Sequence, residues 1–206
     1  IRKSSSADVR QDLDEIDRIE NTGDRASAFE ARATNLFSQQ AYETAAIFYN
    51  KLLASPGIAS ESRMQGLYGL GWSLHKLAQR DRSMEAFRAL LAEYPKSSYA
   101  AQVILLLVEE AHGAGRYGEA ADIALKYVNK ISKNAARLRF MAAESLFETA
   151  KYPDAIVYYR AFLPEADNLA DYTRYRMGLA SYHLRQFNQS INYFGDITDS
   201  AFMERK

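Results

Sequence analysis

The sequence predicts an all-α protein, a right-handed solenoid of about five helical hairpins with an N-terminal capping helix. Apolar residues recur at spacings of three and four along nearly the whole chain, whereas the alternation typical of a β-strand is rare. Only four prolines and ten glycines interrupt it. One short pattern returns five times at nearly constant intervals. Such regular intervals are typical of stacked helical repeats.

Composition excludes several classes of function. The 26 basic and 26 acidic residues give a net charge of zero, so no overall field attracts nucleic acid or an anionic membrane. The absence of cysteine removes disulfides, thiol catalysis and cysteine metal sites. The longest apolar run, 103–108, is too short to cross a bilayer. Because the chain opens without Met or a signal peptide, we expect a trimmed piece of a longer protein, with any export signal or lipid anchor outside it.

The repeated pattern begins at residues 42, 80, 117, 152 and 187, which are 38, 37, 35 and 35 residues apart. We call these five positions the anchors. The clearest copy reads Tyr152-x-x-Ala155-x-x-x-Tyr159-x-x-Phe162. The second copy departs from the pattern with Arg80 at its anchor, and the third has Val108 where a small residue is usual. Each anchor is expected to open the second helix of a hairpin.

A small residue on each first helix is predicted to face a small residue on the second, so that the two backbones approach closely. A large side chain at Gly71 or Ala155 should therefore cost about 1–3 kcal/mol through overpacking. The predicted pairs are Ala33 with Ala45, Gly71 with Ser83, Ala143 with Ala155, and Gly178 with Ser190. Turn residues agree with the hairpins: Pro56, Pro95 and Pro164 follow second helices, Pro153 lies just inside one, and Gly113 and Gly115 separate the third pair.

The expected organisation has three parts. Residues 1–24 form an N-terminal segment in which Val9, Leu13, Ile16 and Ile19 share one helix face. We expect this helix to cap the first repeat, and the alternative is the end of a coiled coil that makes an oligomer. Residues 200–206 are expected to begin a further helix. The repeats in between are expected at 25–56, 60–95, 97–131, 134–164 and 167–199.

Over residues 25–199 the sequence resembles the tetratricopeptide repeat (TPR) family. The long spacing and the segment 87–101 are similar to the bacterial envelope branch, which includes the outer-membrane assembly lipoprotein BamD and a Tol-Pal-associated periplasmic protein. The resemblance implies that first helices line an inner groove that binds a protein or peptide. It also implies a location in the periplasm or at the outer membrane, and the alternative is the cytoplasm.

Mapped onto this sequence, the resemblance implies a set of groove residues on the first helices. We expect half of them to be exposed, with Tyr68 and Trp72 the strongest candidates, because these side chains bury much area at low entropic cost. The chaperone-binding members of the family use Lys, Arg and Asn at such positions, which argues against a chaperone tail as the partner. The partner-binding residues are Tyr68, Trp72, His75, Leu105, Glu109, Phe140, Glu144, Phe147, Tyr175, Leu179 and Tyr182; Glu30, Thr34, Phe37 and His112 occupy neighbouring positions.

No pattern indicates catalysis, a cofactor or a metal. The histidines His75, His112 and His183 would lie about 10 Å apart in adjacent repeats, too far to share ligand bonds of about 2.0–2.1 Å. Glu144 and Glu148 lack an accompanying phosphate loop or nucleophile motif. We therefore expect a non-catalytic scaffold for protein interaction. The alternatives are an accessory domain of a larger enzyme and a nucleic-acid-binding helical repeat, the latter opposed by acidic inner positions.

Overall fold

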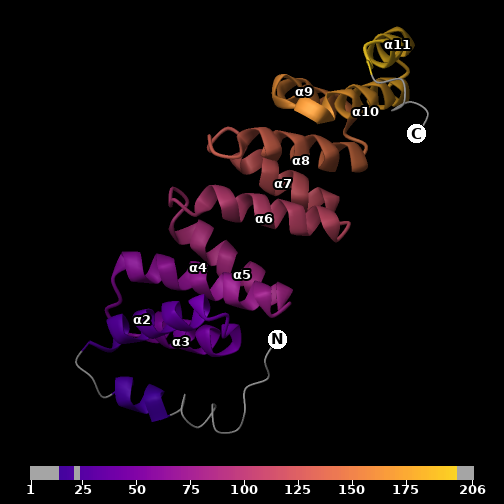
Figure 1. Cartoon of the computed structure of the whole chain (residues 1–206). Helices are drawn as coiled ribbons and strands as arrows, with labels where there is room; N and C mark the ends of the chain where they lie inside the picture. Colours follow the sequence, from indigo (N-terminus) through magenta and orange to yellow (C-terminus); the bar gives the residue numbers. More distant parts are fainter. Residues whose placement is uncertain (1–13, 21–23, 199–206) are drawn as a thin grey trace. The chain divides into compact units, whose positions relative to one another are not determined.

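The computed structural model describes residues 14–20 and 24–198 (Figure 1). These residues form α-helices, two short 3₁₀ helices and turns, and none of them forms a strand. The all-helical prediction is therefore confirmed. The chain divides into two compact units, Ile1–Ala100 and Ala101–Lys206. The predicted further helix at 200–206 lies outside the described residues, as do Val9 and Leu13.

Ten helices form five consecutive pairs in the described part of the chain. Every second helix begins at its predicted anchor, and α3, α5 and α9 each end two residues before a proline. The pairs are α2 (Arg25–Ser38) with α3 (Tyr42–Ala54), α4 (Ser60–Lys76) with α5 (Arg80–Glu93), α6 (Ala100–Gly113) with α7 (Tyr117–Tyr127), α8 (Ala135–Glu148) with α9 (Tyr152–Phe162), and α10 (Ala170–His183) with α11 (Phe187–Gly195). The 3₁₀ helices η1 (Leu163–Glu165) and η2 (Asp167–Leu169) precede α10.

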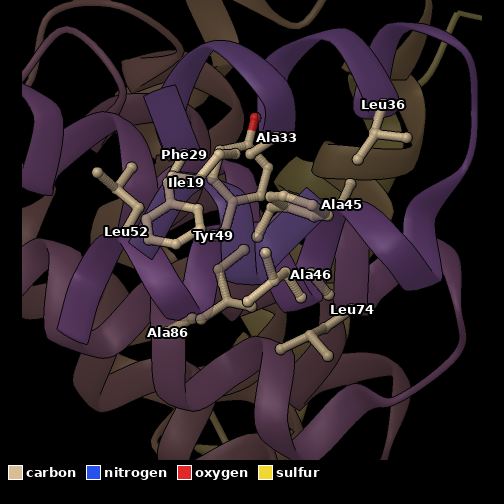
Figure 2. Packing of buried hydrophobic residues seen from close by; sticks show 13 residues of the cluster. Ile19, Phe29, Ala33, Leu36, Ala45, Ala46, Tyr49, Leu52, Leu74 and Ala86 are labelled. Carbon is tan, nitrogen blue, oxygen red and sulfur yellow. The ribbon is translucent and has the colours of Figure 1, made fainter. Parts of the chain in front are cut away.

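The first unit has one continuous core built from α2, α3 and α4 (Figure 2). Phe29 of α2 and Phe48 of α3 meet edge to face, with their ring centres 6.1 Å apart. Leu70 and Leu74 of α4 extend the same core to the second pair. In the second unit a corresponding core joins α7, α8, α9 and α10. Each hairpin therefore buries its apolar residues against its neighbour as well as within itself.

Residues 14–20 are helical and cover the first pair. Ile16 and Ile19 are buried in the core of the first unit, as predicted for a capping helix. Two ion pairs hold the outer side of this segment, from Arg32 to Glu15 at 2.9 Å and from Lys51 to Glu20 at 2.6 Å. Burial of the two isoleucines contributes most of the free energy that holds this segment on the first pair, because exposed ion pairs add little.

Two of the predicted small-residue contacts are hydrogen bonds. The Ser83 hydroxyl donates to the Gly71 carbonyl at 2.8 Å, and the Ser190 hydroxyl donates to the Gly178 carbonyl at 2.9 Å. The glycines also make room for a ring from the second helix. A Cβ atom at Gly71 would lie 2.5 Å from the Phe87 ring. The physical reason for the glycine is therefore ring packing together with backbone approach.

Every first helix ends in the same turn. The residue two positions before each anchor has a left-handed backbone, with φ between 58° and 74°. The next amide donates to the carbonyl five residues earlier, as Gln79 does to Leu74 at 3.0 Å and Lys151 to Leu146 at 2.9 Å. This is the Schellman arrangement, which satisfies carbonyls at the end of a helix. The left-handed residues are Gln40, Ala78, Gly115, Ala150 and Arg185.

None of the described helices combines the length and the apolar character needed to cross a membrane.

The left-handed turn residues predict opposite effects on stability for alanine-to-glycine and glycine-to-alanine substitutions. Ala78→Gly and Ala150→Gly should each raise the free energy of unfolding by about 0.5–1 kcal/mol. The left-handed backbone costs an L-residue about 1–2 kcal/mol, and glycine avoids this cost. Part of the gain is lost because glycine gives up more backbone entropy on folding. Gly115→Ala should lower it by a similar amount, since a Cβ atom there meets nothing within 4 Å and only the backbone is affected. Urea denaturation measures all three. A loss of stability in both alanine-to-glycine variants would contradict the turn geometry.

Candidate partner-binding surface

The predicted partner-binding residues lie on the first helices of four pairs, where the sequence analysis placed them. Helix α4 belongs to the first unit, and α6, α8 and α10 belong to the second. The positions are Tyr68, Trp72 and His75 on α4; Leu105 and Glu109 on α6; Phe140, Glu144 and Phe147 on α8; and Tyr175, Leu179 and Tyr182 on α10.

Helix α4 carries an aromatic row. Tyr68 stacks on Tyr99, with ring centres 4.0 Å apart and planes 16° apart. Trp72 meets Tyr68, His75 and the buried Phe87 edge to face. Both Tyr68 and Trp72 are half-buried, and burial raises the pKa of the Tyr68 phenol above its ordinary value. Trp72 thus packs against the core through Phe87, and the half-buried rings of Tyr68 and Tyr99 stack on each other; we call this pair the Tyr68–Tyr99 edge.

The expectation that half of the predicted residues are exposed is wrong. Only Tyr182 is exposed, at 57%. Leu105 and Glu144 are buried, and the other eight are half-buried. The physical reason is that rings on first helices pack against one another and against neighbouring helices, as Phe140 does with Phe162 at 5.1 Å. Leu105 and Glu144 therefore do not reach a partner from these positions.

Glu144 lies at the centre of a polar network that joins α8, α9 and α10. Its carboxylate accepts hydrogen bonds from the Tyr159 hydroxyl, from the Tyr172 hydroxyl at 2.9 Å and from Arg176 Nε at 3.1 Å. The same guanidinium donates to Glu148 at 2.7 Å and lies 3.6 Å from the centre of the Phe147 ring. The buried charge is paired and hydrogen-bonded on several sides, which is the condition for tolerating it.

The network also fixes protonation. Burial, reinforced by the negative charge of Glu144, raises the pKa of Tyr159 above its ordinary value. The same two causes raise the pKa of Tyr172. Both phenols are therefore donors at neutral pH, and Glu144 receives both hydrogen bonds. This carboxylate therefore holds α8, α9 and α10 together through three hydrogen bonds.

The three histidines occupy the last turn of α4, α6 and α10 and pack on rings. His183 stacks on Tyr152, with centres 4.6 Å apart and planes 6° apart. His112 meets Tyr117 edge to face, and its Nδ1 lies 3.1 Å from the Ser145 hydroxyl. Within the described ranges, no three potential ligands from His, Asp or Glu gather where they could hold a metal ion.

A ring pair recurs at the turn of four hairpins, between the anchor and the residue five positions before it. Phe147 and Tyr152 illustrate it, with centres 5.3 Å apart. In the last pair the corresponding rings, Tyr182 and Phe187, are 5.7 Å apart and more than half exposed. Sequence reasoning placed Tyr182 in the groove but did not single out Phe187, because an anchor was interpreted only as the start of a second helix.

Comparison with known sequences finds one tetratricopeptide repeat. A sequence model of that repeat matches residues 65–97, which include most of α4 and all of α5. Among proteins of known function, none matches the sequence closely enough to indicate a relative.

Several solved structures share the arrangement of helices. MamA from AMB-1 has a TM-score of 0.64 at 15% identity, over 83% of this chain and 88% of that chain. MamA from Desulfovibrio magneticus RS-1 has a TM-score of 0.59 at 13% identity, over 85% and 94%. YrrB, a TPR protein described as having an unusual peptide-binding site, has a TM-score of 0.62 at 16% identity, over 88% of each chain.

The chain has a tetratricopeptide repeat fold. At these identities the likeness concerns the fold alone, so what YrrB binds is a property of YrrB. Within the TPR fold, the match at 65–97 places the aromatic row of α4 in a recognised repeat. None of the matches described above is a protein of the envelope branch of the TPR family.

The Glu144 network makes a prediction for Tyr159→Phe. At neutral pH this variant should lose about 1.5–3 kcal/mol of unfolding free energy, because a charged acceptor loses one donor. The pKa of Tyr159 is raised in the folded state, so its contribution is complete below the ordinary value of 10.0 and is lost as pH rises beyond it. Between pH 10 and 11, stability of the variant should therefore fall less steeply than that of the parent. Urea denaturation across pH 8–11 measures both effects. Equal slopes above pH 10 would show that Tyr159 ionises freely.

Proposed function

We propose that this chain is a non-catalytic protein-interaction scaffold of the bacterial cell envelope, located in the periplasm or at the outer membrane. The TPR fold supports an interaction role because its repeated hairpins present long rows of first-helix side chains on a rigid frame. In the described residues the polar network around Glu144 joins α8, α9 and α10 through hydrogen bonds between their own side chains. The envelope location is supported by the sequence of 87–101 and by the long repeat spacing.

The observation that carries the proposal is the edge formed by Tyr68 and Tyr99 on the first unit. Two tyrosine rings held face to face present a pre-ordered apolar surface with polar tips. Such rings bind a partner at low entropic cost, since they have few rotatable bonds and are already fixed. Trp72 meets Tyr68 edge to face and also packs on Phe87, so it helps to hold Tyr68 in place. A peptide with apolar side chains fits this edge better than an anion does.

The binding test compares two tyrosine variants. Tyr68→Ala should weaken capture of the partner from an envelope extract at least tenfold, because it removes half of the stacked pair. Its circular dichroism should stay within a few percent of the parent's. Tyr127→Ala is the matched control, since Tyr127 is also half-buried but lies on the second helix α7. Mass spectrometry after cross-linking identifies and quantifies the captured protein.

Three outcomes would contradict the scaffold proposal. An equal loss in both variants would show that capture does not depend on the Tyr68 edge. Capture unchanged in Tyr68→Ala would show that the edge is not the contact. Binding of single-stranded RNA with a steep salt dependence, without protein capture, would assign the chain to nucleic acid. Cell fractionation tests the envelope location separately, and recovery only in the cytosol would contradict that part.

A further inference from the structure

A carboxylate lies beside the Tyr68–Tyr99 edge, on the neighbouring first helix. Glu30 of α2 and Tyr68 of α4 each lie 12 residues before the anchor of their own hairpin, so they occupy the same position of the repeat. Helices α2 and α4 are in contact, and both belong to the first unit. Packed helices have axes about 8–10 Å apart. Glu30 and Tyr68 are therefore neighbours on the surface that these two first helices form.

The Glu30 carboxylate has no counter-charge within the chain as described. Its side chain is half-buried, and no cationic group among residues 14–20 and 24–198 forms an ion pair with it. Glu144 and Glu148 of α8, by contrast, share the guanidinium of Arg176. Partial burial removes water from a carboxylate, and an ion pair normally offsets that loss. A cationic group of a partner would supply what Glu30 lacks.

The phenol of Tyr49 belongs to the same cluster of side chains. Its ring packs on the backbone of α4, where a Cβ atom at Gly69 would collide with it. Burial raises the pKa of Tyr49 above its ordinary value, and the negative charges of Glu30 and of an ionised Tyr99 add to the shift. The Glu30 carboxylate and the phenols of Tyr49 and Tyr99 are thus close enough to influence one another.

The second unit shows how this repeat accommodates an arginine. Tyr159 is the equivalent of Tyr49, seven residues after its anchor, and its hydroxyl accepts a hydrogen bond from Arg176 Nε at 3.0 Å. The same guanidinium pairs with Glu144 at 3.1 Å and lies 3.6 Å from the centre of the Phe147 ring. A phenol, a carboxylate and a ring face together hold the arginine.

The first unit has the phenols and a carboxylate but no arginine of its own at this place. The equivalent of Arg176, 11 residues before the anchor, is Gly69. The equivalent of Glu144 is Thr34, and the carboxylate of this unit is Glu30, one turn earlier on α2. The groups that bind a guanidinium inside the second unit are therefore present in the first unit without an internal cation to bind.

We propose that Glu30 and the Tyr68–Tyr99 edge bind an arginine side chain of the partner peptide, with the guanidinium paired to the carboxylate and its plane against a tyrosine ring. Arginine fits better than lysine, because a planar guanidinium bonds a carboxylate through two N–H groups and also stacks on an aromatic face. A nucleic acid fits poorly, since the carboxylate repels phosphate. The inference rests on the proposed scaffold function and specifies the chemistry of the partner at the same edge.

The probes are three peptides, Gly-Leu-Ala-Xaa-Ala-Leu-Gly, in which Xaa is arginine, lysine or citrulline, the neutral analogue of arginine. Trp72 is the only tryptophan of the chain and contacts Tyr68, so its fluorescence reports binding to the full chain. The arginine peptide should bind about tenfold more tightly than the citrulline peptide, and also more tightly than the lysine peptide. Glu30→Gln should weaken the arginine peptide about tenfold and leave the citrulline peptide unchanged.

Glu43→Gln is the matched control, because it makes the same change of charge at an exposed residue of the second helix α3. It should leave all three affinities unchanged. Four results would overturn the proposal: no binding of the arginine peptide, equal affinity of the arginine and citrulline peptides, a lysine peptide that binds as tightly as the arginine peptide, or equal loss in Glu30→Gln and Glu43→Gln.

Capture of the envelope partner distinguishes this proposal from the scaffold function. Glu30→Gln should weaken capture about tenfold, as Tyr68→Ala does, because both remove part of one site. Loss of capture in Tyr68→Ala with unchanged capture in Glu30→Gln would overturn the arginine site and leave the scaffold function in place. Unchanged capture in Tyr68→Ala would contradict the scaffold function itself, whatever the peptides show.

Discussion

Each hairpin depends on the hydrogen bond that closes its turn. The amide just before each anchor donates to the carbonyl five residues earlier, at 2.9 Å for Ala41, Arg116, Lys151 and Gln186 and 3.0 Å for Gln79. This hydrogen bond requires a left-handed residue between the two helices. The second helix begins at the anchor, one residue after the donor amide. Because the start of the second helix is fixed, Ser83 and Phe87 meet Gly71 of α4 in the same way as Ser190 and Phe194 meet Gly178 of α10.

The register set by the turn explains why rings gather where they do. The anchor ring lies against the residue five positions earlier, and the next first helix then covers the pair, as His183 covers Phe147 and Tyr152. A side chain that the repeat pattern places on a first helix is therefore often part of the contact between hairpins. Surfaces available to partners arise where this covering is incomplete. The Tyr68–Tyr99 edge of the first unit is one such place.

Much of the fold was predictable from the sequence because the repeat is periodic. The five anchors mark the starts of α3, α5, α7, α9 and α11, and the small residues Gly71 and Gly178 face Ser83 and Ser190 as expected. The turn conformation was less predictable. Of the turn residues, only Gly115 is of a type that predicts a left-handed backbone. Ala78 and Ala150 adopt this backbone because the Schellman hydrogen bonds require it, although alanine disfavours it.

The candidate surface was predicted less well, for a physical reason. The repeat pattern predicts which side of its own helix a side chain lies on. It does not predict which side chains of the next helix pack against it. Trp72 packs on Phe87, and Glu144 is enclosed by Tyr159, Tyr172 and Arg176, three residues 15 to 32 positions away in sequence. Phe187, the anchor of the last pair, is 53% exposed, although sequence reasoning did not single it out as a surface residue.

Hydrogen exchange at the turn amides tests most directly whether one turn geometry organises all five hairpins. Residue-resolved NMR of the full chain would report the amides of residues 41, 79, 116, 151 and 186. The account predicts that all five exchange far more slowly than the amides of exposed turn residues, including the four whose left-handed residue is not glycine, because each donates to a helix carbonyl. Protection at Arg116 alone, after Gly115, with the other four exchanging as unprotected amides, would contradict it.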